Sequence, residues 1–213
     1  MTKTLVVVSG GTSEPSSTRM LADRIADRAV ERAAERGVAV RVQVVDLRPL
    51  AAEIAAAQTS GFAAGALEEA VRTVAEADGL VVATPVYKAG VSGLVKSFVD
   101  VLDTDAVVAT PTVLAATAGT ARHSLVADEQ LRSLFAYLRA LTTPTSVFAA
   151  GEDWNDPGFG DRIDRAANEL VVLLAAGVRD EMRSGAYSRP FTAATDAPIE
   201  LDTDLMRLAA GGA

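Results

Sequence analysis

The chain has 213 residues, 49% of them hydrophobic and only 5% aromatic, so aliphatic and alanine side chains must fill the core of one main domain. A formal net charge of -8 disfavours a broad nucleic-acid-binding surface, because phosphate backbones are bound by basic faces. Cysteine is absent, which excludes disulfides, thiol nucleophiles and thiolate metal sites.

The first residues carry no recognisable targeting segment. Met1, Thr2 and Lys3 lead directly into an apolar strand, and no apolar run approaches the roughly 20 residues of a membrane span. We therefore expect a cytoplasmic protein that associates with neither membranes nor nucleic acid.

The start of the chain predicts a strand, a loop, a helix and a second strand. Residues 4–8 are a β-branched and leucine run without alternation, which is typical of a buried parallel strand. Residues 9–18 are rich in glycine and hydroxyl groups, and residues 17–36 carry an apolar stripe that predicts a helix ending at Gly37. The stripe consists of Leu21, Ala22, Ile25, Ala26, Ala29 and Ala33. Residues 38–45 predict the second strand.

The middle of the chain centres on a strand, a loop and a helix. Residues 50–65 are alanine-rich and predict a short helix followed by a loop, and residues 66–77 predict a further helix. An apolar strand follows at residues 80–83, and we expect Pro85 to end its hydrogen-bond ladder because proline has no N–H group. Helical spacing of apolar residues resumes over 91–102.

The remaining elements complete an alternating pattern. Strands are predicted at 112–117 and 145–149, and helices at 126–141 and 163–174. This alternation indicates an α/β fold in which a five-stranded parallel sheet of order 2-1-3-4-5 lies between two layers of helices.

The last part of the chain differs from the rest. We expect the main domain to cover residues 1–179. Residues 180–213 are rich in Gly, Ser, Thr, Pro and acidic residues and have few apolar anchors. We interpret them as a polar, helix-free extension that lies on a partner subunit.

The loops after the first and third strands are neighbours in that strand order. The first loop, residues 9–18, enters a helix N-terminus, where unpaired N–H groups and the helix dipole favour an anion such as phosphate. An ordinary loop with an N-cap is the alternative. The patterns G-x-G-x-x-G and G-x-x-x-x-G-K-[ST] are absent, which disfavours a Rossmann dinucleotide site and a Walker site.

The second loop, residues 85–90, offers backbone amides and flat apolar surface for a planar ring, and Gly119 after the fourth strand adds a third wall. No acid and base pair converges on these loops. We therefore predict no catalytic side chain and no metal site. Hydride transfer between two cofactors, which needs only stacking and orientation, fits better than hydrolysis.

Three segments carry a resemblance to a known family. They read S-G-G-T-S-E-P-S-S-T at 9–18, T-P-V-Y-K-A-G-V-S-G-L-V-K-S-F-V-D at 84–100 and A-T-A-G-T-A-R-H-S-L at 116–125. With them the chain resembles the NADPH-dependent FMN reductases, and among these the reductase components of two-component flavin-dependent monooxygenases, over about residues 4–175. The resemblance implies a flavodoxin-like three-layer sandwich that transfers hydride from NADPH to FMN and supplies reduced flavin to a partner monooxygenase. It also implies a homodimer or homotetramer.

The resemblance further implies which residues bind FMN. They are Ser9, Thr12, Ser16, Ser17 and Thr18 at the phosphate, Pro85, Val86 and Tyr87 at the ribityl chain and ring, and Thr117, Ala118 and Gly119 at the far edge of the ring. Many members of the family have an arginine early in the phosphate loop, whereas this chain has Gly11, Thr12 and Ser13 there. The resemblance therefore implies weaker phosphate binding, which suits a flavin that comes and goes.

Four side chains near these loops could either contact a ligand or serve only as structural or surface residues. Tyr87 could stack beside the flavin or serve as a half-buried anchor. Lys88 and Arg122 are candidates for the NADPH 2′-phosphate, and solvated surface charges are the interpretation we favour. His123 is the sole histidine, and we interpret it as structural or peripheral because no paired carboxylate is evident.

Three other functions stay open on the sequence. A flavoprotein could retain FMN and reduce quinones, azo compounds or metal oxyanions. A flavodoxin-type electron carrier would have no enzymatic activity of its own, although a T-x-T-G-x-T style phosphate loop is absent. An interaction protein on the same fold would bind no flavin at all.

Overall fold

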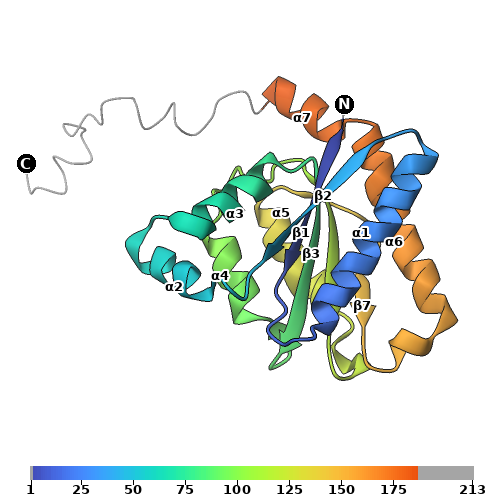
Figure 1. The fold of residues 1–213 in the computed structure, drawn as a ribbon, viewed down its shortest axis with the longest axis horizontal. Coiled ribbons are helices and arrows are strands. Elements are labelled where there is room, and N and C mark those ends of the chain that lie inside the picture. The colour runs from blue at the N-terminus through green and yellow to red at the C-terminus, as the bar shows by residue number, and fades with distance from the viewer. Residues whose placement is uncertain (1, 187–213) are drawn as a thin grey trace, which may run out of the picture.

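The computed structural model describes residues 2–186 and has a central sheet with helices on both faces (Figure 1). The strands are β1 (Lys3–Ser9), β2 (Val40–Asp46), β3 (Gly79–Tyr87), β4 (Gly90–Val91), β5 (Pro111–Thr117), β6 (Leu141–Thr142) and β7 (Val147–Ala149). The helices are α1 (Ser17–Glu35), α2 (Ala51–Ser60), α3 (Gly65–Glu76), α4 (Gly93–Val101), α5 (Arg132–Tyr137), α6 (Pro157–Ala175) and α7 (Val178–Ala186). Shorter helical segments are η1 (Ala121–His123), η2 (Ala127–Leu131) and η3 (Asp153–Asn155).

The sheet is parallel apart from one short pair. Its order is β2-β1-β3-β5-β6, with β7 also paired to β5 and β4 paired antiparallel to β3. The predicted α/β class and parallel sheet are confirmed. The prediction of a five-stranded sheet of order 2-1-3-4-5 is wrong in its strand number, because β4 and β6 are additional strands within the described residues. Each has two residues, too few to produce a recognisable pattern in the sequence. The strands that were predicted pair in the order β2-β1-β3-β5-β7.

Alternate residues of the buried strands enter two separate cores. Leu5 and Val7 of β1 pack under α1 and α6, while Val6 and Val8 pack under α2 to α5 on the opposite face. Figure 1 shows α1 and α6 on one side of the sheet and α2, α3 and α4 on the other. All six residues of the apolar stripe predicted in the first helix are buried. The apolar pattern therefore predicted correctly which face of α1 packs on the sheet.

The third strand continues past Pro85, so the prediction that this proline ends the ladder is wrong. Pro85 pairs with Thr117 of β5. The carbonyl of Ala83 accepts a hydrogen bond from the Gly10 N–H at 2.9 Å, and residues two apart on a strand direct their peptide groups to the same side. The Pro85 nitrogen thus faces the β1 side, where β1 has already ended at Ser9. Its missing N–H leaves no ladder hydrogen bond unmade.

The helix predicted over 126–141 is divided into two elements. The first, η2, is a π-helix, and α5 follows it directly. Arg139 has a φ of 56°, which ends the helical path, and Leu141 then pairs with Pro111 in the sheet. A π-helix contains an extra residue in its turn, and helical spacing of apolar residues does not reveal it in the sequence.

The C-terminal extension begins with a helix, so the prediction of a helix-free chain from Asp180 is wrong for α7. Lys3 Nζ donates to Asp180 Oδ2 at 3.1 Å, and Arg179 Nη2 donates to the carbonyl of Ala75 at 2.7 Å. Polar contacts of this kind leave no apolar stripe in the sequence, which explains the error. Residues 187–213 lie outside the described residues, and the domain boundary at residue 179 stays a prediction.

Asp164 of α6 joins the two helices on one face of the sheet. Its Oδ1 accepts from Arg28 Nε at 2.7 Å and Arg32 Nε at 2.8 Å, and its Oδ2 accepts from Arg32 Nη2 at 2.7 Å. The hydrogen bonds from Arg32 are the main cause that lowers the pKa of Asp164. A carboxyl group whose pKa is lower in the folded than in the unfolded protein stabilises the fold at pH values above its unfolded-state pKa. This stabilisation is lost as the pH falls through the folded-state pKa.

We predict that Asp164→Asn lowers the melting temperature by about 2–4 °C at neutral pH, because the amide removes the charge and keeps the size. The difference between wild type and variant should narrow as pH falls below about 4, the ordinary aspartate pKa. Differential scanning calorimetry over a pH series measures both effects. A difference that stays constant down to the lowest pH at which the protein folds would contradict the electrostatic explanation.

Candidate functional site

The carboxyl ends of β1 and β3 meet at one edge of the sheet. Ser9 pairs with Ala83, and the next residue, Gly10, donates its N–H to the Ala83 carbonyl. The predicted adjacency of the loops at 9–18 and 84–92 is confirmed. The region beyond the carboxyl ends of such strands is where open α/β sheets bind ligands.

Two glycines let the first loop fold tightly. A Cβ on Gly10 would lie 2.1 Å from Val95 Cγ2 of α4, and a Cβ on Gly11 would lie 1.9 Å from Ser16 Oγ. The loop therefore packs directly on α4 and closes back on the start of α1. The glycine-rich and hydroxyl-rich composition indicated an anion-binding loop, but it did not reveal this steric requirement for glycine.

The N-terminus of α1 is capped and carries no acidic residue in its first turn. Ser16 Oγ accepts from the Arg19 N–H at 3.2 Å, so Ser16 is an N-cap, as the alternative interpretation stated. Ser17 is exposed, whereas Ser9 and Thr18 are buried. Ser9 Oγ also accepts a long hydrogen bond of 3.5 Å from the Gly11 N–H. The capped helix still presents first-turn N–H groups and its positive dipole end to an anion.

Two hydroxyl pairs join three loops at this edge. Thr12 Oγ1 and the Tyr87 hydroxyl are 2.5 Å apart, which connects the first loop to the end of β3. Thr18 Oγ1 and Thr117 Oγ1 are 2.6 Å apart and buried, which connects the start of α1 to the end of β5. Four of the predicted FMN-binding residues thus form two contacting pairs. Their binding of FMN stays a prediction.

The second loop is a tight hairpin. Tyr87 pairs with Gly90, and the two residues between them, Lys88 and Ala89, both have positive φ, of 50° and 62°. This is the two-residue hairpin geometry that suits the twist of the flanking strands. Gln130 of η2 holds the hairpin, because its Nε2 donates to the Ala89 carbonyl at 3.1 Å and its Oε1 accepts from a backbone N–H of β4 at 3.1 Å.

The predicted ring-binding residues differ in their exposure. Pro85 is buried, Val86 is half-buried, and Tyr87 is 48% exposed at the rim. A buried proline can line the site only through the backbone around it. Beneath it, Thr84 Oγ1 accepts from the Ser92 N–H at 3.1 Å, which fixes the chain entering α4.

The loop after β5 forms the third wall. The Ala118 N–H donates to the Ala149 carbonyl at 3.0 Å, which aligns this loop with β7. Gly119 is exposed, and a Cβ built on it would have no atom within 4 Å. Arg122 is exposed and His123 is half-buried in η1, immediately after this wall.

The first loop also carries an ion pair that the sequence pattern did not predict. Arg48 follows β2, and its Nη2 lies 2.6 Å from Glu14 Oε2. The Arg48 hydrogen bond is the main cause that lowers the pKa of Glu14. The position of Arg48 after a strand adjacent to β1 was the one available signal, since the carboxyl ends of parallel strands share an edge.

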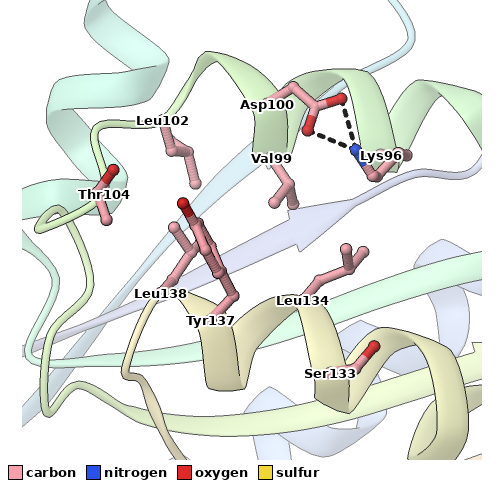
Figure 2. Close-up of a pocket in the computed structure, with 9 residues that line it drawn as sticks. All are labelled: Lys96, Val99, Asp100, Leu102, Thr104, Ser133, Leu134, Tyr137 and Leu138. Carbon is pink, nitrogen blue, oxygen red and sulfur yellow. Dashed lines mark hydrogen bonds and ion pairs between the residues drawn. The ribbon is translucent and has the colours of Figure 1, made fainter.

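A separate hollow of about 500 Å³ lies between α4 and α5. Figure 2 shows the Tyr137 ring standing between the two helices, with the Lys96–Asp100 ion pair at the other end of the hollow. Its apolar lining is Val99, Leu102, Leu134 and Leu138. This hollow, which we name the α4–α5 groove, is on a helical face of the molecule and contains none of the predicted FMN-binding residues.

Comparisons with known proteins agree with one another. Residues 3–155 match the family described as NADPH-dependent FMN reductase. The NADH-dependent FMN reductase SfnE of Pseudomonas putida is 38% identical over 177 residues, which are 81% of this chain and 92% of that protein. An FMN reductase (NADPH) of Pseudomonas aeruginosa is 38% identical over 152 residues, 71% of this chain and 79% of that protein.

Solved structures show the same relationship. An oxidoreductase from Corynebacterium diphtheriae has 47% identity and a TM-score of 0.80 over 82% of this chain and 98% of its own. The apo form of an NADH:FMN oxidoreductase, EmoB, has 26% identity and a TM-score of 0.74 over 84% of this chain and 94% of its own. A WrbA-like flavodoxin from Agrobacterium tumefaciens, at 16% identity and a TM-score of 0.59 over 83% of this chain and 99% of its own, shows the flavodoxin-like fold alone.

We predict that Thr18→Val destabilises the protein by about 1–3 kcal/mol, because the buried Thr117 hydroxyl loses its partner. The double variant Thr18→Val, Thr117→Val should recover most of this loss, since it removes both polar groups and keeps their shape. Urea unfolding of the four proteins in the cycle measures the coupling. Strictly additive effects would show that the two hydroxyls do not depend on each other.

Proposed function

Because the chain belongs to the NADPH-dependent FMN reductase family, we propose that it binds FMN at the shared edge of β1, β3 and β5 and releases it once reduced. As a member of this family it is an oxidoreductase that reduces FMN with NAD(P)H. The observation that supports the location is the pair of hydroxyl contacts, Thr12 with Tyr87 and Thr18 with Thr117, which draws three loops around one edge.

The residues at this edge suit the two parts of FMN. The N-terminus of α1, with Ser16 and Ser17, offers N–H and hydroxyl donors to the phosphate. The rim formed by Val86 and Tyr87 offers apolar and aromatic surface to the ring, and the open space at Gly119 leaves room for its far edge. Bound FMN supplies the hydride acceptor and NADPH the donor. The protein then contributes binding, orientation and backbone donors.

Release of reduced flavin to a flavin-dependent monooxygenase is the second part of the proposal. Residues 9–18 contain no lysine or arginine, so the loop by itself provides no cationic side chain to pair with a phosphate. A loosely held FMN behaves as a substrate that leaves after each turnover. The alternative is a tightly bound FMN that passes electrons to quinones, azo compounds or metal oxyanions.

We also propose a cytoplasmic homodimer or homotetramer. No helix of residues 2–186 is long and apolar enough to cross a membrane. The α4–α5 groove is the surface that we assign to a second copy of the chain. Tyr137 supports this assignment, because it is 74% exposed beside an apolar lining, and aromatic residues of this kind are enriched at interfaces.

We predict that NADPH oxidation by the purified protein depends saturably on added FMN. Ser17→Ala should raise the KM for FMN about tenfold or more with little change in kcat, as expected for the loss of one hydrogen bond to a charged phosphate. Ser13→Ala is the matched control in the same loop, since its hydroxyl donates to the Pro15 carbonyl instead. Full activity with flavin that co-purifies and does not exchange would favour the retained-FMN alternative.

We predict that Tyr137→Asp lowers the oligomeric mass measured by light scattering, because a carboxylate would be desolvated in the groove interface. Val172→Asp on α6, an exposed apolar residue in the opposite helical layer, is the control and should leave the mass unchanged. If Tyr137→Asp keeps the wild-type mass, the groove is not the contact between copies.

A further inference from the structure

The loop at residues 9–18, which binds the FMN phosphate in the proposed function and is here named the phosphate loop, contains a negative charge and no positive one. Between residues 9 and 18 the sole charged residue is Glu14. Arg19, the first cation of α1, has its Nε 2.7 Å from Asp23 Oδ1 on the same helix. A phosphate at the N-terminus of α1 would therefore meet a nearby carboxylate, which opposes its binding unless another group neutralises it.

Arg48 is the group that neutralises Glu14. It reaches the loop from the turn after β2, and its backbone N–H donates to Asp46 Oδ1 at 3.1 Å. Asp46 pairs with Ser9 in the sheet, and the Leu47 N–H donates to the Ser9 carbonyl at 3.0 Å. The turn that carries Arg48 is thus fixed to the strand from which the phosphate loop departs.

We propose that Arg48 binds the phosphate of FMN and that Glu14 competes with this phosphate for the guanidinium. The proposal rests on the proposed function, which locates FMN at the N-terminus of α1. Glu14 is two residues before the N-cap Ser16. Arg48 is far from Ser16 in the sequence, but its contact with Glu14 brings the guanidinium to the loop that leads into this terminus. Both ions of the pair are partly exposed, at 43% for the Arg48 side chain and 78% for Glu14, which leaves the guanidinium free to exchange one oxyanion for the other.

The chemistry of the guanidinium group makes this exchange possible. Its planar fork of donors fits carboxylate and phosphate equally in shape, and the phosphate carries the larger charge. Binding of FMN then requires the Glu14–Arg48 ion pair to open or to be shared, which weakens the net affinity. The pair therefore sets how readily FMN leaves, and Arg48 distinguishes FMN from riboflavin, which lacks the phosphate.

The experiment measures dissociation constants of FMN and of riboflavin by flavin fluorescence with the full-length chain. Arg48→Ala should weaken FMN binding about tenfold, the scale of one charge-assisted hydrogen bond. Its riboflavin constant should stay within about twofold, because riboflavin has no group for Arg48 to bind. Arg48→Lys should keep part of the preference for FMN. Glu14→Gln should tighten FMN binding about threefold or more, because it removes the competing charge.

Arg41→Ala is the matched control. Arg41 is on β2, the strand that precedes Arg48, and its Nη2 donates to Thr4 Oγ1 well before the carboxyl end of the strand. This variant should change neither constant. In the wild type, added salt should weaken FMN binding and leave riboflavin binding unchanged, and this second measurement needs no variant to fold.

Three results would overturn the inference. They are equal weakening of both flavins by Arg48→Ala, weaker FMN binding in Glu14→Gln, and FMN binding in the wild type that is insensitive to salt. Failure of the proposed function gives a different result, namely a wild-type protein that does not oxidise NADPH when FMN is added. A wild type that turns over FMN, combined with an unchanged FMN-to-riboflavin ratio in Arg48→Ala, rejects the role of Arg48 alone.

Discussion

The parallel pairing of β1 with β3 is the contact on which the candidate site depends. It runs from Leu5 opposite Gly79 to Ser9 opposite Ala83, with both strands buried between two helical layers. Burial on both faces leaves only the strand ends accessible, so polar backbone groups can meet a ligand just where the strands stop. The loops after these strands therefore leave the sheet side by side, although about 70 residues separate them along the chain.

Much of the fold could be predicted because burial leaves a regular trace in the sequence. The stripe from Leu21 to Ala33 and the continuous apolar strands identified α1 and the sheet. The features that were missed have a different physical origin. Strands β4 and β6 are too short for a period, the π-helix η2 shifts the period by one residue, and α7 is held by charges such as those of Arg179 and Asp180. The prediction that Pro85 ends the strand was wrong because a missing N–H matters only where a neighbouring strand lies opposite it.

The residue types at the candidate site could be predicted from the sequence, but the contacts between these residues could not. The hydroxyl-rich loop and the adjacent segments follow from the order of the elements. The contacts that hold them, Thr12 with Tyr87 and Thr18 with Thr117, join residues that no local pattern connects. The Glu14–Arg48 ion pair spans 34 positions in the sequence and depends on which strand borders β1. Long-range pairing of this kind follows from topology, and side-chain type alone does not specify it.

The contact between Gly10 and Val95 couples two surfaces of the molecule. Val95 of α4 occupies the space that a side chain on Gly10 would need, while Lys96 and Val99 of the same helix line the α4–α5 groove. No side chain separates the backbone of the loop at residues 9–18 from this helix at Gly10, and close-packed interiors have low compressibility. The position of α4 and the conformation of the loop are therefore sterically linked, because any side chain added at Gly10 would have to displace one or the other.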